Sequence, residues 1–122
     1  MKTAFVFGRA IFGGFFLYNG INHFLKRKEL TQYAGAKNVA NPDIAVVLSG
    51  LALLFGGTSF IIGKKHRLGA AAIVSFLSAV SPLMHDFWKS PNPEQKMNEM
   101  INFTKNMALL GAALAFLGVK ES

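Results

Sequence analysis

The sequence predicts an all-α membrane protein, a four-helix transmembrane bundle, and three observations lead to that fold class. First, 52% of the 122 residues are hydrophobic. Second, these residues gather in four stretches, 3–25, 44–63, 68–88 and 98–119, each close to the ~20 residues that a bilayer-spanning helix needs. Third, the stretch 44–63 contains no charged residue, which a surface helix of a soluble protein tolerates poorly. We therefore expect one membrane domain over residues 1–122.

The first span, 3–25, should be a retained membrane helix rather than a signal peptide. Arg9 interrupts it early, and no convincing small-residue cleavage site follows. One face of this helix is polar at both ends and aromatic in the middle: Arg9, Phe12, Phe16, Asn19 and His23. After Leu25 we expect a short interfacial helix that ends near Gly35 and places Leu30, Tyr33 and Ala34 on one face.

The second span, 44–63, is opened by Asn41-Pro42-Asp43. This order predicts a capping Asn, a proline at the first helical position and an acid at the positive end of the helix dipole. Small residues then follow one face at alternating four- and three-residue steps, a pattern typical of close helix approach in lipid. These residues are Ala45, Ser49, Ala52, Gly56, Ser59 and Gly63.

The third and fourth spans, 68–88 and 98–119, carry similar small-residue faces. The first runs through Ala71, Ser75, Ser78 and Pro82 to His85, and the second runs from Lys105 through Ala108, Ala112, Ala115 and Gly118. We expect these faces to point inward and large residues such as Phe76 and Leu77 to face lipid. Because Asn92-Pro93-Glu94 repeats the earlier Asn-Pro-acid device, the sequence also indicates two pseudo-repeated helical hairpins.

Polar residues should gather at one end of this bundle. In an even-numbered antiparallel bundle, the ends of the first and third helices meet the starts of the second and fourth. The candidate pocket there consists of His23, Tyr33, His85, Asp86, Trp88, Lys105 and Asn106. An ionisable group inside a span usually faces the protein interior, so we expect an Asp86–Lys105 ion pair. The alternative is that Lys105 extends to the lipid headgroups and Asp86 is merely interfacial.

A quinone headgroup is the ligand that this pocket suits best. His and Lys side chains can donate to its two carbonyls, His can carry a proton, and the aromatic residues offer flat apolar surface. Haem is unlikely because helices that pack closely through small residues leave no wide slot, and two histidines are too few for a closed zinc site. The chain has no cysteine and no motif of a known catalytic centre, so we assign no catalytic residue and no metal ligand.

The net charge of +7 does not indicate a nucleic-acid-binding protein. The basic residues lie beside the spans, as in 26–28 and 64–67, where they meet anionic lipid headgroups, and they are not interleaved with aromatic residues. Their numbers on the two membrane sides are nearly equal, which leaves the orientation open. The expected partners are the lipid bilayer, a membrane or redox protein, and a second copy of the chain.

Several segments together resemble the DoxX family. They are Gly8-Arg9 with Phe15-Phe16-Leu17, Gly20 and His23-Phe24; Tyr33-Ala34 with Lys37 and Asn41-Pro42; His85-Asp86-Phe87-Trp88; and Phe103 with Lys105-Asn106-Met107-Ala108-Leu109-Leu110-Gly111. The resemblance implies a four-helix, multi-pass integral membrane protein, which we expect in the bacterial plasma membrane. It favours an accessory or quinone-interacting subunit of a membrane redox system. A non-enzymatic membrane scaffold or chaperone, and a lipid- or small-molecule-binding protein, remain open alternatives.

Overall fold

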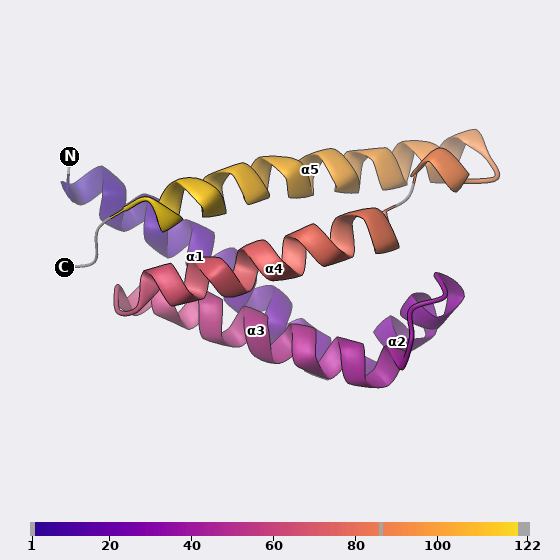
Figure 1. Cartoon of the computed structure of the whole chain (residues 1–122), viewed down its shortest axis with the longest axis horizontal. Helices are drawn as coiled ribbons and strands as arrows, with labels where there is room; N and C mark the ends of the chain where they lie inside the picture. The colour runs from indigo at the N-terminus through magenta and orange to yellow at the C-terminus, as the bar shows by residue number, and fades with distance from the viewer. Residues whose placement is uncertain (1, 86, 120–122) are drawn as a thin grey trace.

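The fold is all-α, as predicted, in a computed structural model that describes residues 2–85 and 87–119. Its helices are α1 (Lys2–Leu25), α2 (Arg27–Ala36), α3 (Pro42–Ile62), α4 (His66–Met84), the short 3-10 helix η1 (Phe87–Lys89) and α5 (Pro93–Leu117) (Figure 1). Four segments, those of α1, α3, α5 and α4 with its extension to Lys89, are long and apolar enough to cross a membrane. The expected transmembrane bundle is therefore confirmed.

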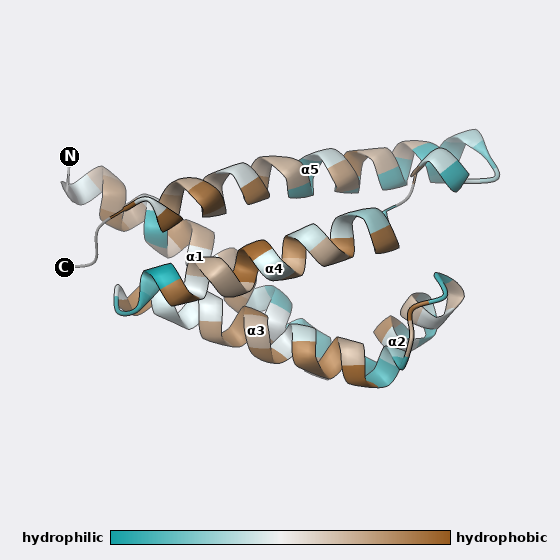
Figure 2. Ribbon diagram, viewed as in Figure 1, coloured by the Kyte–Doolittle hydropathy of each residue, from teal (hydrophilic) through white to brown (hydrophobic). Residues whose placement is uncertain are grey.

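The helices pack in a chain of neighbours. α1 lies along α3, α3 also contacts α4, α4 contacts α5, and α2 rests on α3. The start of α1 and the end of α5 lie at one end of the bundle, and α2 lies at the other (Figure 1). Hydrophobic residues run along the long helices, whereas hydrophilic residues gather in α2, at the start of α5 and at the turn between α3 and α4 (Figure 2). The end that holds α2 is the one at which the sequence places the polar pocket.

Glycines bring α1 and α3 into close contact. A Cβ atom added at Gly13 would lie 2.7 Å from the Gly57 carbonyl oxygen, and one added at Gly57 would lie 2.5 Å from the Leu17 backbone nitrogen. On its other side α3 meets α4 through Gly56, where an added Cβ would lie 2.8 Å from Ile73 Cγ1. The backbones approach this closely only because side chains are missing at these points. The predicted small-residue face of α3 is therefore a packing surface.

The inward faces predicted for α4 and α5 are wrong. Ala71, Ser75 and Ser78 are exposed, whereas Leu77 is buried in the core. On α5 the buried residues are Glu99, Asn106 and Ala113. The inward face is therefore shifted by one residue from the predicted face, which begins at Lys105. The physical reason is complementarity, because the glycines of α3 leave space that a facing helix must fill with large side chains. The core they form contains Phe16, Leu53, Phe60, Ile73, Leu77 and Ala113.

The helix ends follow the sequence signals in part. Pro42 and Pro93 both occupy the first turn of a helix, as expected. Asn92 caps α5, since its side-chain oxygen accepts a hydrogen bond from the Gln95 backbone N–H at 2.7 Å. Asn41 makes no such bond and instead turns the chain with a left-handed φ of +47°. α4 ends at Met84, before the predicted end at 88, and α5 begins at Pro93, before the predicted start at 98.

Aromatic rings close the bundle at the end away from α2. Phe12, Phe60 and Phe116 come from α1, α3 and α5, and their ring centroids lie 4.8–5.2 Å apart. Edge-to-face and tilted pairs at such distances add to the stability gained from burial alone. Three of the four membrane helices are thus held together at one end, and a cavity lies toward the other.

Candidate functional site

A cavity of about 320 Å³ lies toward the polar end of the bundle, and each of α1 to α5 contributes to its wall. α1 contributes Phe15 and Phe16 to its wall, and α4 contributes Phe76, Leu77 and Val80. Its volume lies at the lower end of the range for small-molecule sites, which are mostly apolar with a few polar groups. The cavity therefore has the size and the lining that a planar organic headgroup needs.

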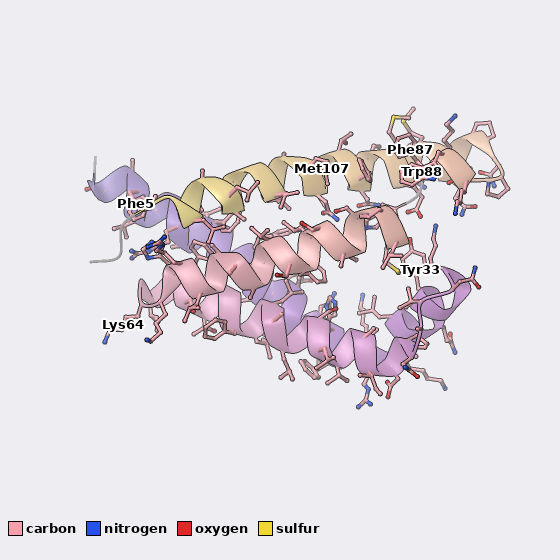
Figure 3. All side chains as sticks on the ribbon, in the orientation of Figure 1. Phe5, Tyr33, Lys64, Phe87, Trp88 and Met107 are labelled. Carbon is pink, nitrogen blue, oxygen red and sulfur yellow. The ribbon has the colours of Figure 1, made fainter. Side chains whose placement is uncertain are left out.

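Five of the predicted pocket residues line this cavity: His23, Tyr33, His85, Lys105 and Asn106. Trp88 does not line it, because it lies in η1, is 52% exposed, and packs against Phe87 and Phe103. Figure 3 shows Phe87 and Trp88 beside the start of α5 and Tyr33 on the α2 side of the bundle. Asp86 lies outside the described residues. The structure thus brings together side chains from three helices, α1, α2 and α5, and the residue that follows α4.

Two basic side chains line the cavity, His23 from α1 and Lys105 from α5. His23, on α1, has its Nδ1 atom 2.7 Å from the carbonyl oxygen of Asn19, and its ring meets Phe76 edge-on. Lys105, on α5, donates from Nζ to the Asn102 side-chain oxygen at 3.4 Å and lies 5.8 Å from the centre of the Phe15 ring. The Asp86–Lys105 ion pair stays a prediction, because Asp86 is not among the described residues.

Asn106 is the most unusual polar residue of the cavity wall. It is only 7% exposed, and its side-chain amide makes no hydrogen bond to any described residue. The amide lines the cavity, so its two N–H donors and its oxygen are open to a group placed there. Asn106 therefore gives the cavity wall a polar group that can bond to a polar ligand atom.

Glu99, which the sequence analysis missed, is the centre of a polar cluster at the rim of the cavity. Its carboxylate is nearly buried and accepts hydrogen bonds from Lys37 Nζ at 2.6 Å, from the Tyr33 hydroxyl at 3.1 Å and from His85 Nδ1 at 3.2 Å. The Tyr33 hydroxyl also lies 3.1 Å from the Met84 carbonyl oxygen. The cluster therefore ties α2 and the residue after it to the end of α4 and to α5.

One signal in the sequence could have revealed Glu99. It precedes Asn106 by two helical turns, so the two residues share one helix face. Glu99 lies only one residue inside the predicted span 98–119 and close to the polar residues Glu94, Gln95 and Lys96, so the sequence alone does not distinguish it from a polar connector.

Arg27, at the start of α2, forms a bidentate salt bridge with Asp43 at the start of α3, with N···O distances of 2.8 and 2.6 Å. Both side chains are about half exposed, so this pair adds little stability by itself. It does fix α2 to the first turn of α3, and Leu30, Tyr33 and Ala34 of α2 then line the cavity. Within the described residues, no group of three or more His, Asp or Glu side chains could hold a metal ion.

A comparison with protein families gives one match. The family model described as DoxX matches residues 4–86, which is more than half of the chain. The matched range includes His23, Tyr33 and His85, whereas α5, with Glu99, Lys105 and Asn106, follows it. No curated protein and no solved structure matches the chain.

Proposed function

The chain belongs to the DoxX family of membrane proteins, and from that premise we propose that it is an accessory, quinone-binding subunit of a membrane redox system. The observation that supports this proposal is the cavity, which combines aromatic walls with polar groups that can form further hydrogen bonds. Lys105 and the unbonded amide of Asn106 can donate to a quinone carbonyl, and Phe15, Phe16 and Phe76 offer apolar surface to the ring.

The position of the cavity within the membrane helices also favours a lipid-soluble ligand. Quinones with isoprenoid tails dissolve in the hydrocarbon layer, where the tail gains apolar contacts and the headgroup needs hydrogen bonds. A cavity that is apolar in the bundle and polar near the membrane face meets both needs.

Asn106→Leu is expected to weaken quinone binding by about tenfold or more, because it removes a buried hydrogen bond to the ligand. The measurement is equilibrium dialysis of a benzoquinone with a short isoprenoid tail against the purified protein in lipid nanodiscs. Asn98→Leu is the matched control, since Asn98 is an exposed residue of the same helix and does not line the cavity.

No saturable quinone binding by the wild-type protein would overturn the proposal, as would equal affinities of the Asn106→Leu and Asn98→Leu variants. A scaffold function is the second candidate, and the exposed small-residue face of α4 favours it because such faces accept a partner helix. A protein that co-purifies in a fixed ratio from the native membrane, together with an empty cavity, would decide for the scaffold.

A further inference from the structure

We infer that the cavity selects the reduced, hydroxyl-bearing form of its ligand, a hydroquinone, over the quinone. This inference rests on the proposed function and names the redox form that the same site prefers. It comes from the hydrogen bonds of the two histidines that line the cavity, His23 and His85.

The first step concerns His23. Its Nδ1 atom lies 2.7 Å from the Asn19 carbonyl oxygen. A carbonyl oxygen can only accept a hydrogen bond, so the His23 ring must carry its proton on Nδ1. In the neutral imidazole Nε2 is then a hydrogen-bond acceptor, and it is the ring nitrogen left for a ligand.

The second step concerns His85, whose side chain is 16% exposed. Its Nδ1 atom lies 3.2 Å from one oxygen of Glu99, while Lys37 Nζ lies 2.6 Å from the other oxygen. The lysine ammonium favours the ionised carboxylate, which only accepts hydrogen bonds. His85 therefore also donates from Nδ1 and keeps Nε2 as an acceptor when the ring is neutral.

The two redox forms of the ligand differ in how they meet these acceptors. A quinone carbonyl cannot donate, so it would leave both Nε2 atoms without a partner, and an unpaired buried acceptor is unfavourable. A hydroxyl group donates through its hydrogen and accepts through its oxygen. A hydroquinone can thus donate to His23 or His85 and still accept from Lys105 or Asn106. A quinone can only accept from Lys105 or Asn106.

The test compares the two redox forms of one ligand. A benzoquinone with a short isoprenoid tail and its chemically reduced hydroquinone are titrated anaerobically against the protein in nanodiscs. We expect the hydroquinone to bind at least tenfold more tightly. A redox titration of the bound ligand is a second readout, since a tenfold preference for the reduced form raises a two-electron midpoint potential by about 30 mV.

One variant, His23→Phe, and one control, His66→Phe, test whether His23 causes the preference. His23→Phe removes the Nε2 acceptor and keeps a ring of similar size. The only hydrogen bond of the His23 ring to a described residue runs from Nδ1 to a carbonyl of its own helix, so the fold should persist. It is expected to weaken hydroquinone binding several-fold and to leave quinone binding nearly unchanged. His66→Phe is the control, because His66 lies at the other end of the bundle, with Nε2 3.1 Å from the Val119 carbonyl oxygen, and should leave the ratio of the two affinities unchanged.

The outcomes separate the inference from the proposed function. If neither redox form binds, the proposed function fails. If both forms bind equally, if the quinone binds more tightly, or if His23→Phe weakens both forms alike, the inference fails while the quinone-binding function stands.

Discussion

Replacing Glu99 by alanine is expected to lower the free energy of unfolding by about 3–5 kcal/mol. The Lys37 ammonium group, with only 13% of its side chain exposed, would lose the carboxylate that lies 2.6 Å away. Tyr33 and His85 would lose the same acceptor. Breaking several hydrogen bonds to a buried carboxylate is more unfavourable than separating two exposed charges, because water does not fully replace the lost bonds.

The measurement is unfolding of the protein in mixed micelles by increasing sodium dodecyl sulfate, followed by circular dichroism. Glu94→Ala is the matched control, because Glu94 is exposed in the first turn of the same helix and should contribute under about 1 kcal/mol through the helix dipole. Equal losses at the two positions would show that the Glu99 cluster does not hold α2 to α4 and α5.

Gly57→Ala is expected to destabilise the bundle by about 1–3 kcal/mol through overpacking between α1 and α3. The new Cβ atom would lie 2.5 Å from the Leu17 backbone nitrogen and 2.7 Å from the Gly13 carbonyl oxygen. Both neighbours are backbone atoms, so no side chain can rotate away, and the two helices must move apart.

Gly14→Ala is the control, and it should not lower the stability of the protein. A Cβ atom at Gly14 would meet nothing within 4 Å. Alanine favours a helix over glycine by up to about 1 kcal/mol, so this variant should be as stable as the wild type or more stable. Thermal unfolding in detergent measures both variants, and a Gly57→Ala protein that melts together with Gly14→Ala would contradict the close crossing.

Local signals were sufficient for most of the fold. The length and apolar character of the spans, the absence of charge in 44–63, and proline at the first turn of α3 and α5 are all properties of neighbouring residues. The polar end of the bundle followed from the alternation of helix directions, and it holds five of the predicted pocket residues. The face of α1 that carries Phe16 and His23 also followed from helical spacing, because residues three or four apart share one side of a helix.

The inward faces of α4 and α5 depended on the tertiary structure. In lipid, small and large apolar residues are almost equally suited to the helix exterior, so the hydrophobic effect does not choose between the two faces. The choice came from the neighbouring helix: Gly56 of α3 faces Ile73, and Leu77 fills the core, which places Ala71 and Ser75 on the outer face.

The chemistry of the site was likewise decided by contacts between distant segments. Glu99 became the acceptor for Tyr33, Lys37 and His85 only when α2 was folded against the ends of α4 and α5. The sequence by itself determined that four apolar helices form a bundle with polar residues at one end, because those features depend on local composition and spacing. Only the tertiary structure decided which groups are paired and which, like the Asn106 amide, make no hydrogen bond to a described residue, because pairing depends on distances that no local pattern contains.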